Sequence, residues 1–431
     1  MTAAIVVTDD LARTSAVDLP AMTVAGDAMV GAAERFADDF SAGAFDHDQS
    51  GTFATEHLDQ LRSSRFLVSP VSTEFGGGGV RSVRDILVAS SRLARGDVAT
   101  AIGVNMHFAV LLNVIRGWRT AIARGDDRRA SAASASLQRI VEDDIVFASA
   151  VSEPAPQDLT RPRTTAVRTA DGWVIEGRKV FTTMAAAATI VNTAVTYHAA
   201  DGTERYGFAF VPTSAPGVEF PDDWDAIGMR ASASGSMSLH GVVVGVDAVR
   251  DGFAVGSYTP ALFDRFLASG AFHASASLGI AESSHFAMVD ALTRRPEAVL
   301  DDPHAMTGLA DNVVDLTAMQ ASLDLAGRRI DQYRAAFPCG EATLAEAQAV
   351  TAAVQAAKAF ICTGAQRVTD RALALSGGAG YMSKHPLAKA WRDARAGAFM
   401  HPFGANRAYD LVARTALGLE ARREPGSVRS R

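Results

Sequence analysis

The hydrophobic period of this chain changes twice along its 431 residues, and this change constrains the fold most. Residues 24–140 show helical spacing, residues 144–249 show the alternation typical of short strands, and helical spacing returns after residue 256. A chain of this length corresponds to two or three domains of about 150 residues each. We therefore expect an α+β fold in which a β domain lies between two helical regions.

The first helical region contains three apolar-periodic segments: Val24–Phe40, Phe53–Phe66 and Ser82–Val114. A glycine run, Gly76–Gly79, separates the second segment from the third. This run is interpreted either as a flexible connector or as part of a ligand loop.

The middle region contains two pairs of alternating segments, each pair joined by an Asp-Gly turn. The turns are Asp171-Gly172 and Asp201-Gly202, and both are hairpin signals. Such frequent turns predict a compact domain of roughly six to eight short strands. The paired segments are Thr165–Val167 with Trp173–Phe181, and Asn192–Tyr197 with Tyr206–Val211.

The last region carries one long stripe of small and apolar residues spaced by threes and fours, from Leu344 to Ala372. It stops at Gly377-Gly378, where a helix is expected to end. Small residues permit close helix approach, so this stripe indicates a helical bundle.

These patterns predict four parts. Residues 1–22 are expected to be a flexible tail, residues 23–143 an α-helical domain, residues 144–250 a β barrel or sandwich, and residues 251–431 a four-helix bundle domain.

Composition excludes several classes of function. The net charge is −7 and no segment concentrates Lys and Arg, so nucleic acid is not an expected partner. No run approaches the roughly 18 uninterrupted apolar residues of a membrane span, and no secretion signal is evident, so the expected location is the cytoplasm. Cys339 and Cys362 provide neither a disulfide framework nor a zinc site, and no metal is expected.

Five short motifs occur in a fixed order, two of them at strand ends. They are Ser152-Glu153-Pro154, Phe181-Thr182-Thr183, Gly228-Met229-Arg230-Ala231-Ser232, Gly377-Gly378-Ala379-Gly380-Tyr381 and Trp391-Arg392-Asp393-Ala394. In this order and spacing they resemble the acyl-CoA dehydrogenase superfamily of flavoproteins, from about Val24 to the C-terminus. The resemblance implies N-terminal helices, a central β domain, a C-terminal four-helix bundle and a flavin, FAD or FMN.

Four residues of the β domain match positions that hold the flavin in this family. The resemblance implies that Ser152 and Thr183 hydrogen-bond the isoalloxazine and that Phe181 lies against the ring. Thr182, between Phe181 and Thr183, is also expected to contact the cofactor. The alternative is that these are ordinary strand-end hydroxyls that satisfy local backbone groups.

The resemblance also assigns the phosphate side of the cofactor. Gly377, Gly378 and Gly380 match a loop that serves the flavin of a neighbouring subunit, which implies a homotetramer or at least a homodimer. Arg294 lies where the family has an arginine near the adenine side of FAD. The phenylalanine-glycine pair that usually follows is absent, which leaves room for FMN. A helix C-cap and a surface arginine are the alternatives.

Three polar residues are candidates for the substrate pocket by the same resemblance: Asn105, His107 and His273. A histidine on an apolar helix is more often a structural hydrogen-bonding residue, and that alternative stays open.

The catalytic glutamate of the dehydrogenases is absent from its expected positions. The register downstream of Arg392-Asp393 places His401 there, and Asp264 is the only carboxylate near the alternative position. The family's Gly-Ser-Asp after Glu-Pro is replaced by Pro156-Gln157-Asp158, which weakens the case for a CoA-thioester clamp.

The resemblance therefore leaves three functions. The first is a monooxygenase that takes reduced flavin from a separate reductase and uses O₂ on a small organic substrate, with His401 as the catalytic residue. The second is a dehydrogenase of acyl-CoA or acyl-carrier-protein substrates in which His401 or another residue is the base. The third is a non-catalytic scaffold.

Overall fold

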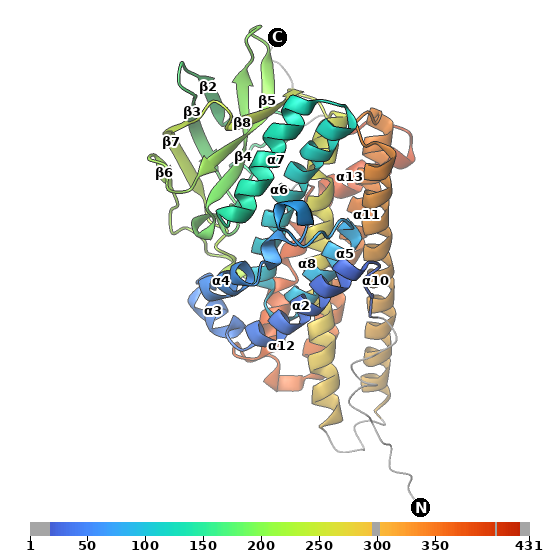
Figure 1. The fold of residues 1–431 in the computed structure, drawn as a ribbon. Helices are drawn as coiled ribbons and strands as arrows, with labels where there is room; N and C mark the ends of the chain where they lie inside the picture. Colours follow the sequence, from blue (N-terminus) through green and yellow to red (C-terminus); the bar gives the residue numbers. More distant parts are fainter. Residues whose placement is uncertain (1–17, 295–301, 401–402, 423–431) are drawn as a thin grey trace, which may run out of the picture.

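The computed structural model describes residues 18–294, 302–400 and 403–422, and every structural statement below concerns these ranges. Long helices run the length of the molecule, the sheet lies at one end, and the N-terminal helices pack beside both (Figure 1). The structure thus has the expected order of helical region, curled sheet and helical region.

The N-terminal region is wholly helical. Its α helices are α2 (Val24–Ser41), α3 (Ala44–Ser50), α4 (Thr55–Ser63), α5 (Val83–Gly96), α6 (Val98–Ala123) and α7 (Asp127–Glu142), with the 3₁₀ turns η1 (Phe66–Val68) and η2 (Thr73–Phe75). Residues 18–22 of the predicted tail are held in place: Asp18 pairs with Arg95, and the Met22 N–H donates to Asp85.

The predicted single segment Ser82–Val114 is in fact two helices. They separate at Asp97, whose backbone is extended and whose carboxylate caps α6 by accepting from the N–H groups of Ala99 and Thr100. The preceding residue, Gly96, packs tightly: a Cβ there would lie 2.1 Å from the backbone oxygen of Ala37. The break therefore depends on a cap and on contact with α2, which hydrophobic periodicity does not encode.

Helix α6 is the one helix of the described residues long and apolar enough to cross a membrane, but its most apolar stretch is 89% buried inside the fold. Its apolar character is explained by burial against α5, α7, α8 and strand β1 (Phe147–Ala150).

The middle region is one curled sheet of eight strands, in the order β6-β7-β3-β2-β4-β5-β8, with β1 parallel to β4. The two predicted hairpins are confirmed as the antiparallel pairs β2–β3 and β4–β5. The strands after β1 are β2 (Thr165–Arg168), β3 (Trp173–Lys179), β4 (Ile190–His198), β5 (Glu204–Pro212), β6 (Val218–Glu219), β7 (Met237–Val244) and β8 (Val249–Ala254), with the turns η3 (Ala185–Ala187) and η4 (Arg230–Ser232).

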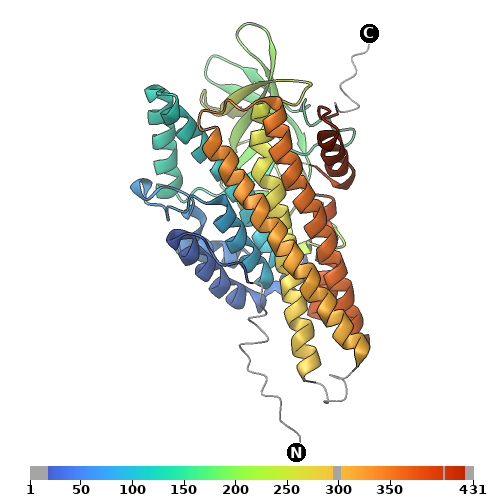
Figure 2. The same ribbon diagram turned by 90° about the vertical axis from the view of Figure 1, so that its right-hand side faces the viewer.

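The C-terminal region consists of three long helices and two short ones. The predicted stripe is confirmed: α11 runs from Leu344 to Leu375, and it packs against both other long helices (Figure 2). The short α13 completes the bundle beside α11. The remaining elements are α8 (Pro260–Thr293), α10 (Pro303–Ala336), η5 (Gly377–Ala379), α12 (Pro386–Asp393), η6 (Ala396–Ala398) and α13 (Ala405–Ala416).

Candidate active site

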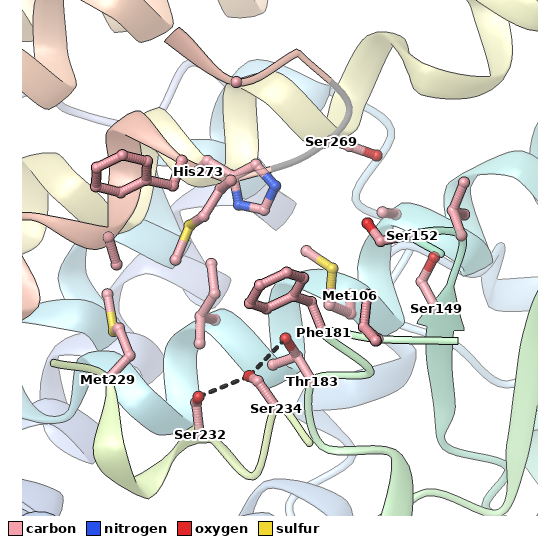
Figure 3. Close-up of a pocket in the computed structure, with 18 of the residues that line it drawn as sticks. Met106, Ser149, Ser152, Phe181, Thr183, Met229, Ser232, Ser234, Ser269 and His273 are labelled. Carbon is pink, nitrogen blue, oxygen red and sulfur yellow. Dashed lines mark hydrogen bonds between the residues drawn. The ribbon is translucent and has the colours of Figure 1, made fainter. Parts of the chain in front are cut away.

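A cavity of about 1070 Å³ lies where strand ends of the sheet face α6, α8 and the turn after α12. Four of the residues predicted to contact the flavin or the substrate line it: Ser152, Phe181, Thr183 and His273. Figure 3 shows the His273 imidazole, from α8, pointing into the cavity on the opposite side from Thr183. Two motifs of the β domain and one helix of the bundle thus meet at one space.

Phe181 presents its ring to the cavity. The side chain is 63% exposed although it is aromatic, and its ring meets Trp224 edge-on at 6.2 Å. Its φ of 56° lies in the left-handed region, which non-glycine residues adopt at a cost of order 1–3 kcal/mol. An exposed, backbone-strained phenylalanine in a cavity is well suited to contact a flat aromatic ligand.

Three hydroxyls form a chain on one wall (Figure 3). Thr183 Oγ1 and Ser234 Oγ are 2.8 Å apart, and Ser234 Oγ and Ser232 Oγ are 2.7 Å apart; in each bond either oxygen can donate. All three residues line the cavity. Ser232 is the last residue of the Gly228–Ser232 motif and Ser234 lies two positions later. Nothing in the sequence indicated that the two serines would meet Thr183.

Glu153 is the only carboxylate among the described residues that line the cavity, and it is already bound. Its Oε1 accepts from Lys179 Nζ at 2.8 Å and from Thr164 Oγ1 at 2.8 Å, and its Oε2 accepts from the backbone N–H of Arg163. Despite burial, which opposes ionisation, Lys179 and these hydrogen bonds lower the pKa of Glu153 to about 2. Glu153 therefore stays ionised and holds the end of β1 to β3.

Asn192 and Arg265 were missed by sequence reasoning. Asn192, on β4, is 2% exposed; its Oδ1 accepts from Arg265 Nη2 at 2.8 Å, while its Nδ2 is a buried donor with no hydrogen-bond partner. The Arg265 guanidinium, from α8, also stacks over the Phe208 ring at 4.0 Å. This end of the cavity therefore offers an unused amide donor beside a positioned cation.

The Gly228-Met229 motif joins the sheet to α12. The Met229 N–H donates to the Asp393 carboxylate at 2.6 Å, and Arg392 donates to the backbone oxygen of Ile227 at 3.1 Å and pairs with the buried Asp48. A Cβ at Gly228 would lie 2.3 Å from the backbone oxygen of Arg392. The glycine and the Arg-Asp pair are thus required to close one wall of the cavity.

Three of the predicted contact residues face away from the cavity. Thr182 donates its hydroxyl to the backbone oxygen of Gly235. Asn105 accepts from Ser90 and donates to the backbone oxygen of Phe272. His107 Nδ1 accepts from the Phe147 N–H, so its Nε2 donates to the oxygen of Leu67. Each of these residues satisfies buried backbone or side-chain groups, and a ligand contact by any of them stays a prediction.

The remaining candidates lie outside the cavity lining or outside the described residues. Arg294 is exposed at the end of α8, near Asp290. Gly377, at φ 70°, and Gly378 have open space where a Cβ would stand, and Gly380 packs on Ser376. His401 lies outside the described residues.

A flavin fits this donor set. The isoalloxazine has an apolar flat face and a polar edge of hydrogen-bonding atoms. The cavity offers the exposed Phe181 ring for the face and the hydroxyls of Ser152 and Thr183 for the edge. Among the described residues, no group of three or more His, Cys, Asp or Glu side chains is placed to hold a metal ion.

Three family models match the chain in consecutive order. The N-terminal, middle and C-terminal domains of acyl-CoA dehydrogenase match residues 23–121, 148–242 and 263–406. The three ranges fall in the N-terminal helices, the sheet and the C-terminal helical region, respectively.

The chain is also similar to several known proteins over most of its length. It is 28% identical to the amino sugar nitrososynthase DnmZ of Streptomyces peucetius, covering 92% of this chain and 94% of that protein. It is 26% identical to the putative acyl-CoA dehydrogenase YdbM of Bacillus subtilis, and the match covers 84% of this chain and 90% of that protein. A solved structure of KijD3 holds FMN and dTDP-3-amino-2,3,6-trideoxy-4-keto-3-methyl-D-glucose. It matches this chain with a TM-score of 0.85 and 29% sequence identity, over 95% of this chain and 97% of the KijD3 chain. The chain belongs to the acyl-CoA dehydrogenase superfamily and is a flavin-dependent oxidoreductase.

Proposed function

We propose that this protein is a flavin-dependent monooxygenase that oxygenates the amino group of a sugar carried on a nucleoside diphosphate. The observation that carries the oxygenase chemistry is that no uncommitted carboxylate lines the cavity among the described residues. When bound, reduced flavin reacts with O₂ and supplies one oxygen atom to the substrate. The protein's own residues bind the two ligands, orient them and exclude water.

Dehydrogenation of an acyl thioester needs a base beside the substrate, and carboxylates are the usual bases for weakly acidic protons. Glu153 accepts hydrogen bonds from Lys179, Thr164 and Arg163 and stays ionised. Asp264 pairs with Arg116 at 3.2 Å and is not part of the cavity lining. An amine nucleophile, by contrast, requires positioning rather than a strong base.

The size and polarity of the cavity support two ligands. Ligand pockets are roughly 300–1,000 Å³, and this cavity, at about 1070 Å³, lies at the large end of that range. The cavity end with Asn192 and Arg265 offers an amide donor and a guanidinium, a pairing that suits phosphate oxygens. KijD3, a relative, binds FMN together with a dTDP amino sugar.

We further propose FMN as the working cofactor, delivered reduced by a separate reductase, and a homo-oligomer as the functional state. Arg294, which would contact the adenine side of FAD, is 81% exposed beyond the cavity lining. The loop after α11 exposes Tyr381 and Met382 beside the open Gly377-Gly378, an apolar surface suited to a neighbouring copy.

Product assays test the proposed function. The purified protein should consume an amino-sugar nucleotide only when reduced FMN and O₂ are both present. Anaerobic, dye-linked oxidation of acyl thioesters would instead identify a dehydrogenase. A protein that binds neither FMN nor FAD would favour the scaffold alternative.

A further inference from the structure

The hydroxyl chain Thr183–Ser234–Ser232 has more protons than internal bonds. Three hydroxyls carry three protons and the chain contains two hydrogen bonds, so one proton remains to be donated at one end. Because either oxygen can donate in both bonds, the chain can run in either direction. In one direction Thr183 donates into the cavity, and in the other it accepts from the cavity.

The residues of the hydroxyl chain are shielded from bulk water and held by a fixed backbone. Ser232 is 1% exposed and Ser234 is 6% exposed, so bulk water has little access to their hydroxyls. The backbone between the two serines is fixed: Ala233 has a φ of 45°, and the Ser232 carbonyl accepts from the Met184 N–H at 3.1 Å. Reversal needs only rotation of three hydroxyl hydrogens and no movement of heavy atoms.

A hydroxyl that contacts the N5 edge of a flavin needs to be able to both donate and accept a hydrogen bond. The N5 atom of an oxidised flavin is a hydrogen-bond acceptor, whereas the N5–H of a reduced flavin is a donor, so a contacting hydroxyl must change role with the redox state. A lone buried hydroxyl that accepts from N5–H would leave its own proton without a partner, which costs about 1–3 kcal/mol.

We propose that Ser234 is a positioning residue that lets Thr183 donate to oxidised flavin and accept from reduced flavin. This inference rests on the proposed function, because it requires flavin in the cavity. When Thr183 accepts from the reduced ring, its own hydroxyl turns to donate to Ser234, and Ser234 in turn donates to Ser232. The Ser232 hydroxyl, which also lines the cavity, then donates into the cavity.

The test measures the affinities for oxidised and reduced FMN separately. Oxidised FMN is titrated by fluorescence quenching, and reduced FMN by anaerobic equilibrium dialysis, with wild type, Ser234→Ala and Ser232→Ala. In Ser234→Ala, Thr183 can still donate, so oxidised FMN should bind with nearly unchanged affinity. Reduced FMN should bind at least threefold more weakly, which lowers the midpoint potential of the bound flavin. Ser232→Ala should show a smaller change of the same sign.

Ser269→Ala is the matched control, because it removes a hydroxyl from another element of the same cavity, α8, outside the chain. Its ratio of the two affinities should stay at the wild-type value. Equal affinities of Ser234→Ala and wild type for both redox states would overturn this proposal alone, as would a ratio shifted equally by Ser269→Ala. A wild-type protein that binds no FMN would overturn the proposed function as well.

Discussion

The carboxylate of Asp393 accepts a 2.6 Å hydrogen bond from the backbone N–H of Met229, a residue 164 positions earlier in the chain. Its other oxygen pairs with Lys389 at 2.8 Å, and the aspartate is 1% exposed. One side chain thus satisfies a buried N–H of the sheet region and a cation of α12, and so holds two walls of the cavity together.

Asp393→Ala should therefore lower both stability and flavin affinity. The variant leaves the Met229 N–H and the Lys389 ammonium without their partner, a loss of about 3 kcal/mol or more in the free energy of unfolding. Urea denaturation and FMN titration measure the two effects. Asp59→Ala is the control, since the Asp59 side chain is 70% exposed and its pair with Arg62 is long, at 3.9 Å. If Asp393→Ala had the same stability and FMN affinity as this control, the contacts of Asp393 with Met229 and Lys389 would not be needed.

His107 should make stability depend on pH between about 4 and 6.5. Burial lowers the pKa of His107 to about 4, and its Nδ1 must stay unprotonated to accept from the Phe147 N–H. In that window the unfolded chain binds more protons than the folded one, so stability rises with pH through the window and is lost as pH falls to 4. At about 1.4 kcal/mol per pH unit, the full effect is about 3 kcal/mol.

The variant His107→Gln isolates this contribution, because an amide can donate to Leu67 and accept from Phe147 without titrating. Denaturation at a series of pH values should give a flatter profile for the variant than for wild type. Parallel profiles would show that His107 is not the titrating group.

Arg265→Ala should weaken binding of the nucleotide substrate while leaving flavin binding intact. The substitution removes the cation at the Asn192 end of the cavity, so KM for the amino-sugar nucleotide should rise about tenfold or more, the loss of one charge-assisted contact of about 1.5–3 kcal/mol. Steady-state kinetics and FMN titration separate the two ligands. Arg129→Ala, at a side chain that is 76% exposed on α7, serves as control. An unchanged KM at position 265 would place the substrate elsewhere.

His401 stays a prediction, since it lies outside the described residues. If it assists the reaction as an acid or base, His401→Ala should reduce turnover about tenfold or more, with nearly unchanged FMN affinity. Single-turnover rates with pre-bound flavin measure this directly. Turnover equal to that of wild type would remove His401 from the mechanism.

The fold was largely predictable from local signals. The two Asp-Gly hairpins and the stripe on α11 arise from turn chemistry and side-chain spacing within short windows, and both are confirmed. The break at Asp97 was not predicted, because it depends on the close approach of Gly96 to α2.

The site was predictable only where a motif carried it. Ser152 and Thr183 could be singled out because they belong to short motifs at strand ends, and both line the cavity. Their contact with a flavin stays a prediction. Asn192 and Arg265 lie 73 positions apart and meet only when α8 packs on the sheet, so no sequence window contains both. Thr182 faces away from the cavity while Thr183 lines it, and only the local backbone decides which hydroxyl reaches a ligand.

The proposed enzyme transfers an oxygen atom to its substrate rather than removing hydrogen from it. Turnover of an amino-sugar nucleotide with reduced FMN under ¹⁸O₂, followed by mass spectrometry of the product, tests it most directly. The product should carry one ¹⁸O atom per oxygenation event, bound to the nitrogen of the sugar. Unlabelled product, together with anaerobic conversion of an acyl thioester to its α,β-unsaturated form, would contradict it.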